Sequence, residues 1–314
     1  MILTTTLNPS VDIRYTMDGL TLDTINRVDA VSKTAGGKGL NVARILKQVD
    51  EQVIATGFLG GTLGTFIEGQ LDSLTIENAF VSVEENTRNC IAIIHNNQQT
   101  EILEKGPKIA REEAARFIEQ FSNVLQKVNF ATISGSLPAG LTSTFYQSLI
   151  TIAAEYDTPV LLDTSGSILC DLLKEKVYPY LIKPNESEFA ELVGKKLSTE
   201  IEILQELQSD MFAPIPWVIV TLGSKGAFIK CNDTYYRAEI PTVQAVNPVG
   251  SGDSVIAGFA KGLNQELEIE EIIKLGLSFG VLNAMEDKTG YINVEQIDSI
   301  MNEVMLRKVE CSSN

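Results

Sequence analysis

A glycine-rich segment at residues 247–254 carries the residue types that phosphoryl transfer needs. It reads Asn-Pro-Val-Gly-Ser-Gly-Asp-Ser and leads directly into the apolar run 255–263. Gly250 and Gly252 let the backbone turn sharply and aim amide N–H groups at one point, where the positive end of the following helix adds to them. Asp253 places a carboxylate beside the expected anion, which indicates a base acting next to a phosphate. The structural alternative is that Asp253 only caps the helix.

A second glycine-bearing segment, residues 34–43, precedes another expected helix and reads Thr-Ala-Gly-Gly-Lys-Gly-Leu-Asn-Val-Ala. Gly36 and Gly37 give a ligand close access to the backbone, Lys38 adds a cation and Asn41 adds an amide. This set suits the hydroxyl groups of a sugar phosphate. A plain helix N-terminus with a solvated Lys38 explains the same residues equally well.

Two further segments could contact a nucleotide and its metal ion. Asn185 and Glu188 lie three residues apart at an expected helix start, so they share a face and could hold magnesium through water. An N-cap followed by a first-turn acid is an equally good interpretation. Residues 221–227, Thr-Leu-Gly-Ser-Lys-Gly-Ala, form a turn that suits a nucleotide-facing loop. The sequence G-x-x-x-x-G-K-[ST] does not occur, which excludes the P-loop kinases.

Short apolar strands that alternate with amphipathic helices are expected to position these segments. Continuous apolar runs of this length favour a parallel sheet buried on both faces, in an α/β layered domain. Such sheets hold their ligands at the carboxyl ends of the strands, where the candidate residues fall. The expected strands are 53–59, 130–134, 160–163, 180–183 and 217–221, with a helix at 65–74 after the first of them.

Two stretches interrupt this alternation of strands and helices. Residues 10–33 and 87–105 have the alternation of strand pairs, so we place them together in a small separate sheet. The large α/β domain then consists of residues 1–9, 34–86 and 106–314.

Composition limits the classes of partner. With 41 acidic and 25 basic residues the formal charge is −16, which argues against nucleic acid and anionic membrane surfaces. No apolar run approaches the roughly 20 residues that span a bilayer, and the N-terminal run resembles a strand rather than a leader, so a cytoplasmic protein is expected. Four scattered cysteines and a single histidine, His95 at an expected strand end, indicate neither a disulfide framework nor a zinc site.

Together these segments resemble the ribokinase, or pfkB, family of carbohydrate kinases, from Thr6 to about Asn293. Two matches make the resemblance specific, namely Gly-Gly-Lys-Gly-x-Asn at 36–41 and Pro-Val-Gly-Ser-Gly-Asp at 248–253. The family usually has Ala at the position of Ser251, a small residue for a small one. The resemblance implies a three-layer α/β domain with a β-sheet lid. It also implies an ATP-dependent phosphotransferase that uses magnesium.

The resemblance assigns a role to each matched residue. Asp253 would be the base that accepts the proton of the sugar hydroxyl, in an anion hole formed by Gly250, Ser251, Gly252 and the amide of Asp253. Sugar contacts would come from Asp12, Gly36, Gly37, Lys38 and Asn41. Nucleotide contacts would come from Lys183, Asn185, Thr221, Gly223, Ser224, Gly226 and Asn283. Asn185 and Glu188 match the magnesium motif of the family.

A sugar that already carries a phosphate needs a further cationic site. Arg88 is the first candidate, with Arg27 and Lys38 as second candidates. The string Thr-Leu-Asn-Pro-Ser-Val-Asp at 6–12, together with Thr-Arg at 87–88, resembles the branch of the family that phosphorylates hexose phosphates. Within that branch, Asn-Cys-Ile-Ala at 89–92 resembles the tagatose-6-phosphate kinases. It implies transfer from ATP to the C1 hydroxyl of tagatose 6-phosphate, which gives tagatose 1,6-bisphosphate in lactose and galactose breakdown.

Two alternatives stay open, one inside the family and one outside enzymes. The first is a 1-phosphofructokinase acting on fructose 1-phosphate. The second is a non-catalytic sugar-phosphate or nucleotide sensor, against which Asp253 and its glycine loop argue. Lids of this family commonly pair between subunits, and the β-branched residues of both lid segments would otherwise expose strand edges, so a homodimer is expected.

Overall fold

The computed structural model describes residues 1–28, 30–96, 98–164 and 166–309, which form two sheets. The large sheet contains β1 (Ile2–Thr6), β4 (Val53–Leu59), β5 (Glu77–Asn78), β6 (Val81–Ser82), β9 (Phe130–Ser134), β10 (Val160–Asp163), β11 (Leu181–Ile182), β12 (Trp217–Thr221), β13 (Ala227–Cys231), β14 (Thr234–Glu239) and β15 (Met305–Val309). Their order is β15-β14-β13-β12-β11-β10-β9-β1-β4-β5, with β6 paired to β4. The strands from β12 to β5 are parallel, and β13, β14 and β15 add an antiparallel edge. The predicted α/β class with a mostly parallel sheet is confirmed.

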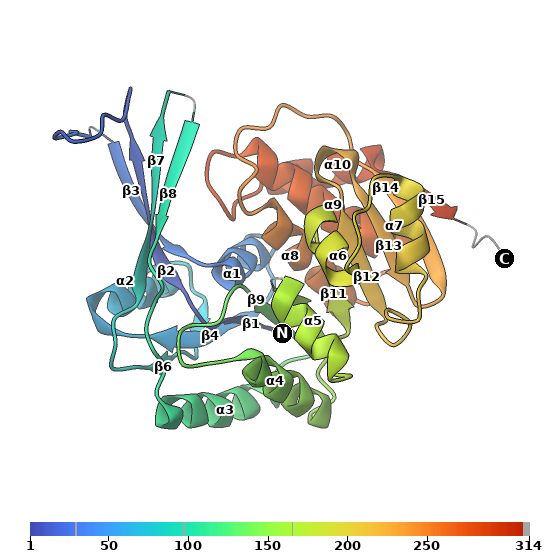
Figure 1. The fold of residues 1–314 in the computed structure, drawn as a ribbon, viewed down its shortest axis with the longest axis horizontal. Helices are drawn as coiled ribbons and strands as arrows, with labels where there is room; N and C mark the ends of the chain where they lie inside the picture. The colour runs from blue at the N-terminus through green and yellow to red at the C-terminus, as the bar shows by residue number, and fades with distance from the viewer. Residues whose placement is uncertain (29, 97, 165, 310–314) are drawn as a thin grey trace.

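Helices cover both faces of this sheet (Figure 1). They are α1 (Lys38–Gln48), α2 (Gly61–Ser73), α3 (Arg111–Leu125), α4 (Ser143–Glu155), α5 (Gly166–Lys174), α6 (Glu186–Val193), α7 (Glu200–Leu207), α8 (Ser251–Asn264), α9 (Ile269–Met285) and α10 (Ile297–Glu303). The core on one face includes residues of α1, α8 and α9, and the core on the other includes residues of α3, α4 and α6. A strand such as β4, buried at all seven positions, needs cover on both faces. The domain therefore has three layers.

Most expected elements have their predicted bounds, and two differ. The strands predicted at 53–59, 130–134, 160–163 and 217–221 match β4, β9, β10 and β12. β11 is shorter than the predicted strand, and α2 begins at Gly61 rather than at residue 65. The glycines of its first turn conceal the helix start, because its N-cap Gly60 makes no side-chain capping bond.

The two interruptions form the predicted small sheet, which we call the lid. It contains β2 (Ser10–Thr16), β3 (Ala30–Gly36), β7 (Arg88–His95) and β8 (Gln98–Leu103), in the order β3-β2-β7-β8. β2 and β7 are parallel, and β3 and β8 are the antiparallel edge strands. Because β3 ends at Gly36 rather than at residue 33, the lid runs straight into the glycines that precede α1 (Figure 1).

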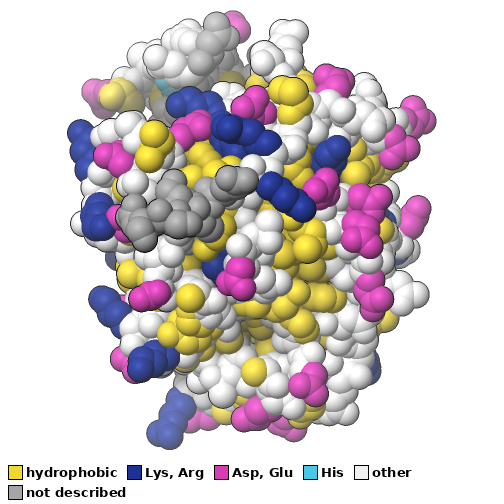
Figure 2. All heavy atoms as spheres, turned by 90° about the vertical axis from the view of Figure 1, so that its right-hand side faces the viewer, with side chains coloured by type: hydrophobic (Ala, Val, Ile, Leu, Met, Phe, Trp, Pro, Cys, Tyr) yellow, Lys and Arg dark blue, Asp and Glu magenta, His cyan; other side chains and the backbone are white. Residues whose placement is uncertain are grey.

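The surface and the cysteines agree with the composition. On the face shown in Figure 2, basic side chains lie among acidic ones and apolar side chains are exposed between them. Within the described ranges, no helix is long and apolar enough to cross a bilayer. Cys90, Cys170 and Cys231 are free thiols, and Cys311 lies outside the described residues. His95 ends β7, as expected, and its Nε2 lies 3.0 Å from Thr100 Oγ1.

Candidate active site

The predicted site residues collect at the carboxyl edge of the large sheet. Asp163 ends β10, Lys183 follows β11 and Thr221 ends β12, and these three strands are parallel neighbours. Lys38 and Asp253 lie in the first turns of α1 and α8. The edge therefore joins strand ends to helix N-termini, which is where open α/β sheets bind anionic ligands.

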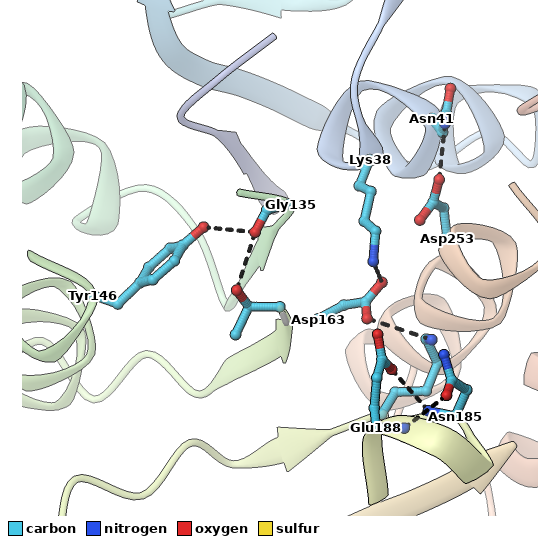
Figure 3. A network of polar contacts seen from close by, with 10 residues as sticks. Lys38, Asn41, Gly135, Tyr146, Asp163, Asn185, Glu188 and Asp253 are labelled. Carbon is cyan, nitrogen blue, oxygen red and sulfur yellow. Dashed lines mark hydrogen bonds and ion pairs between the residues drawn. The ribbon is translucent and has the colours of Figure 1, made fainter. Parts of the chain in front are cut away.

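Asp253 is buried, with 6% of its surface exposed, and is held by Asn41. Asn41 Nδ2 donates a 2.8 Å hydrogen bond to Asp253 Oδ2 (Figure 3). Burial raises the pKa of Asp253 to about 7 and the negative charge of Asp163 adds to this, against the Asn41 hydrogen bond and the charges of Lys38 and Lys183. A carboxyl group with this pKa can accept a proton near neutral pH.

The capping alternative for Asp253 is wrong. The N-cap of α8 is Gly250, and α8 has no side-chain capping bond. Gly250 adopts a left-handed φ of 85°, which favours glycine at this position. The Asp253 carboxylate instead points from α8 to Asn41 on α1 (Figure 3).

The start of α8 offers free donors to an anion. Among the described residues, the N–H groups of Gly252 and Asp253 have no hydrogen-bond acceptor. A Cβ on Gly252 would lie 3.1 Å from Lys183 Nζ, so this buried amine lies beside the same turn. Ser251 Oγ is also buried, and it has no partner in the described part of the chain. Two free N–H groups and an ammonium group therefore lie at the start of α8, whereas the N–H of Ser251, a predicted member of the anion hole, donates to Pro248 O at 3.2 Å. The anion hole itself stays a prediction.

Asp163 is the central charged residue of this edge, and it is not among the residues predicted from the sequence. Its carboxylate is 2% exposed and lies 3.3 Å from Lys38 Nζ and 3.4 Å from Lys183 Nζ. Burial by itself would raise its pKa, but the charges of Lys183 and Lys38 outweigh burial and lower the pKa of Asp163. The available signal was a carboxylate at the end of the otherwise apolar strand β10.

The lid side of the candidate site, where the sugar contacts are predicted, is built around Asp12. Ser10 Oγ donates a 2.7 Å hydrogen bond to Asp12 Oδ1. A Cβ on Gly36 would lie 2.1 Å from Asp12 Cγ, so only glycine leaves room for this carboxylate. Burial raises the pKa of Asp12, while the Ser10 hydrogen bond and the charges of Arg44 and Arg88 oppose the shift. Asp12 is thus a packed residue of the lid rather than a surface acid.

Gly37 and Lys38 continue from Gly36 into α1. Gly37 has φ of 114°, and a Cβ there would lie 2.8 Å from Thr6 Cγ2. Lys38 is the first residue of α1, and its amine points to Asp163 (Figure 3). The Lys38 side chain is 42% exposed, so it is in contact with solvent and also pairs with the buried carboxylate of Asp163. Burial alone would lower the pKa of Lys38, but Asp163 and Asp253 raise it.

The predicted phosphate-binding arginines differ in their surroundings. Arg88 donates from Nη1 to Glu104 O at 2.9 Å and from Nη2 to Asn8 O at 3.1 Å. Its Nε is buried and has no partner within the described ranges. Arg27 is exposed in the connection between β2 and β3, and no contact among the described residues joins it to this group. The structure thus brings Arg88, but not Arg27, to the other site residues.

Asn185 and Glu188 form the alternative arrangement that the sequence left open, a capping box of α6. Glu188 N donates to Asn185 Oδ1 at 2.9 Å, and Asn185 N donates to Glu188 Oε2 at 2.9 Å. The second carboxylate oxygen, Glu188 Oε1, has no donor among the described residues and remains available. A hydrated divalent ion prefers such an oxygen ligand, so the residues fit the predicted metal through water.

The predicted nucleotide loop lies next to this capping box. Thr221 N donates to Pro184 O at 3.0 Å, which places residues 221–226 beside Asn185. Gly223 has φ of 59° and Gly226 has φ of 95° in this turn, and Ser224 is exposed. The nucleotide contacts themselves stay a prediction.

Asn283 of α9 is fully buried and contacts the glycine-rich segment at residues 247–254. Its Nδ2 donates to Val249 O and its Oδ1 accepts from Gly290 N, both at 2.9 Å. The amide therefore supports the loop that carries Gly250. Its predicted contact with adenine stays a prediction.

A model of the pfkB family of carbohydrate kinases matches residues 5–296 of this chain. The chain belongs to this family. Carbohydrate kinases of the pfkB family use ATP and a divalent metal ion, which agrees with the free N–H groups and the open carboxylate oxygen described above.

Solved structures of other proteins share the fold over nearly the whole chain. A Staphylococcus aureus protein provisionally assigned as a phosphofructokinase is 29% identical, with a TM-score of 0.86 and 99% of both chains covered. Escherichia coli phosphofructokinase-2 in complex with potassium is 24% identical, with a TM-score of 0.89, over 96% of this chain and 98% of that one. A Thermotoga maritima protein provisionally assigned as a 1-phosphofructokinase is 23% identical, with a TM-score of 0.89, over 99% and 100%. All three are named as phosphofructokinases, and the two that are less than 25% identical show the shared fold alone.

Proposed function

We propose that this pfkB protein transfers the γ-phosphoryl group of ATP to the C1 hydroxyl of tagatose 6-phosphate, which yields tagatose 1,6-bisphosphate and ADP. The observation that carries a kinase reaction is the buried Asp253, whose pKa is about 7, next to free N–H groups at the start of α8. A sensor needs an anion site but no base with this pKa. The geometry therefore favours catalysis over binding alone.

Each group on the large-domain side has a part in this transfer. Asp253 accepts the proton of the attacking hydroxyl while Asn41 holds its Oδ2. A bond forms between the sugar oxygen and the γ-phosphorus, the bond from that phosphorus to the bridging oxygen breaks, and ADP leaves. The N–H groups of Gly252 and Asp253, with Lys183, face the charge that develops on the transferred group. Mg²⁺, when held through water by Asn185 and Glu188, supplies charge neutralisation to the triphosphate.

The phosphate already on the sugar is assigned to Arg88. This side chain is held by two backbone carbonyls and keeps a buried Nε without a partner among the described residues. It lies opposite Ser10 in the lid register, and Ser10 is the residue that holds Asp12. A single strand pair thus carries both a carboxylate for hydroxyl groups and a guanidinium group for a phosphate.

The choice of tagatose 6-phosphate depends on the string at residues 89–92, which resembles the tagatose branch. The comparisons fit a second candidate better, a phosphofructokinase, because the 29% identical Staphylococcus aureus protein is provisionally assigned that activity. Fructose 6-phosphate differs from tagatose 6-phosphate only at C4. Fructose 1-phosphate carries its phosphate at the other end of the chain.

A coupled assay of ADP release with ATP and Mg²⁺ distinguishes these functions. We expect kcat/KM for tagatose 6-phosphate to exceed that for fructose 6-phosphate and fructose 1-phosphate. A preference for either fructose phosphate would assign a phosphofructokinase activity instead. Binding of all three sugars by calorimetry without any turnover would support the sensor.

A homodimer formed through the lid is part of this proposal. Strand alternation and the observed register put apolar side chains of all four lid strands on the face opposite Asp12, where Val11 and Ala35 are buried in the core of the large domain and six others lie further out. They are Ile13, Tyr15, Val31, Ile91, Ile93 and Ile102. Val31 is 48% exposed and Ile102 is 54% exposed, as in a face that a second subunit covers. Sedimentation should give a dimer for the parent protein and a monomer for Ile93→Asp, and a monomeric, fully active parent would contradict the dimer.

A further inference from the structure

Arg44 of α1 is a buried guanidinium group that the transfer mechanism above does not use. Its side chain is 6% exposed, and it forms no ion pair within the part of the chain that the structure describes. It donates to three separate segments instead: Ala35 O at the end of β3, Asn41 Oδ1 at 3.1 Å and Thr289 O at 2.9 Å. Burying a charge without an ion pair has a large desolvation cost. The hydrogen bonds from the Arg44 guanidinium group offset part of this cost.

The surroundings of Arg44 are shaped to receive it. Gly290 has φ of 73°, and a Cβ there would lie only 2.5 Å from Arg44 Nη1. The ring of Tyr291 lies 5.6 Å from the guanidinium carbon. The chain therefore leaves a space here that no side chain could share with the guanidinium group.

The contact between Arg44 and Asn41 sets the direction of the Asn41 amide. A guanidinium group can only donate, so the Asn41 atom that faces it must be the oxygen. The NH₂ end of the same amide is then turned to Asp253 Oδ2, 2.8 Å away. Without Arg44, the amide could rotate and offer its oxygen to the carboxylate, which would repel it.

We propose that Arg44 is a positioning residue, which orients the Asn41 amide so that Asp253 is held as an ionised base in the attack geometry. This proposal rests on the proposed kinase function. The same guanidinium group lies near Asp12 as well as Asp253. One positive charge therefore attracts a carboxylate of the lid and a carboxylate of the large domain. The charged groups that face Asp253 are Lys38 and Arg44 of α1, Asp163 of β10 and Lys183 after β11.

The test is the pH profile of kcat/KM for Arg44→Lys. This variant keeps the positive charge but cannot donate to all three acceptors at once. The acid limb of the profile, where kcat/KM falls as the pH is lowered, reports the pKa of Asp253 in this proposal. Weaker hydrogen bonding to ionised Asp253 raises its pKa, so the acid limb should move to higher pH by roughly one unit. We expect kcat to fall by roughly tenfold near pH 6.5, less near pH 8.5, and KM for ATP to stay unchanged. In an Asn41→Ala background, Arg44→Lys should no longer move the acid limb, because the link is gone.

Leu149→Ala is the control for stability, since Leu149 is fully buried in α4 and lies in the opposite core. It should lower the melting temperature without moving the acid limb. A folded Arg44→Lys protein with the parent acid limb and the parent kcat would overturn the proposal. If that variant does not fold, Gly290→Ala displaces the guanidinium group from the other side and should move the limb in the same direction.

A second measurement is independent of turnover. The carboxyl ¹³C signal of Asp253, assigned by its loss in Asp253→Asn, should titrate at higher pH in Arg44→Lys than in the parent protein. This shift is expected even if none of the three sugar phosphates is a substrate, so failure of the kinase function and failure of the Arg44 role can be told apart. An unshifted titration would overturn the role of Arg44.

Discussion

The two regions that form the site hold their side chains in different ways. On the large-domain side, Asp163 and Lys183 are buried and ion-paired, and Asp253 is buried against Asn41. On the lid side, β8 is exposed at every position, and an ion pair that joins the lid to the large domain, Arg14 with Asp287 at 3.0 Å, is 39% and 70% exposed. Packing thus fixes the charged groups of the large domain, whereas the lid that carries Asp12 and Arg88 is a thin sheet with an exposed edge strand.

The largest effect should come from the base on the large-domain side. Asp253→Asn keeps the shape of the side chain but removes the proton acceptor, so kcat should fall by about 10³-fold. Sugar and ATP affinities, measured by calorimetry, should change little, because Asp253 is not a binding residue in this scheme. Asp298→Asn, on the exposed face of α10, is the control. Retained turnover would show that Asp253 is not the base.

The next effect concerns the buried charges. Asp163→Asn leaves Lys38 and Lys183 facing a neutral amide, so the free energy of unfolding should fall by about 3 kcal/mol. It should also move the acid limb of kcat/KM to lower pH, because the negative charge that raises the pKa of Asp253 is removed.

Urea denaturation and a pH series measure both changes in Asp163→Asn. Asp171→Asn, exposed on α5, is the matched control and should match the parent protein in both. A loss of stability without any change in the acid limb would show that the charge of Asp163 does not affect the pKa of Asp253.

Gly36→Ala tests where the two regions meet. The added Cβ would lie 2.1 Å from Asp12 Cγ and must displace this carboxylate from the sugar side. We expect KM for the sugar phosphate to rise at least about tenfold, with KM for ATP unchanged. Gly69→Ala in α2, where nothing lies within 4 Å, is the control. An equal rise in both KM values would show that the two regions do not act separately.

The smallest effect should come from the exposed ion pair of the lid. Arg14→Gln removes the bond to Asp287, and because both groups are in contact with water the free energy of unfolding should change by less than about 1 kcal/mol. Arg111→Gln, exposed at the start of α3, is the reference for a surface charge change. A loss as large as that of Asp163→Asn would mean that the lid is held as firmly as the large domain.

Much of this arrangement could be predicted from the sequence because its signals are local. Apolar runs of strand length predicted β4, β9, β10 and β12 at their observed bounds. The glycines at 36–37 and 250–252 marked turns with a left-handed backbone or a close approach, and the structure has both. Asn185 and Glu188 were recognised as neighbours on one helix turn, since three-residue spacing decides that alone.

The links between these segments could not be predicted, because they depend on which strand lies beside which. Asp163 meets Lys38 across 125 positions of the chain, and Asn41 meets Asp253 across 212. No periodicity in the sequence relates residues so far apart. Only the order of the sheet, with β10 next to β9 and β11 and with α1 packed against α8, brings them together.

The sequence by itself therefore determined the family, the two glycine motifs and the residue types at the strand ends, since each depends on residues close together in the chain. The tertiary structure alone decided that Asp253 is buried against Asn41, that Asp163 pairs with two lysines and that Arg44 donates to Asn41. The physical reason is that burial and charge pairing depend on distances through space. Those distances exist only once the layers have packed.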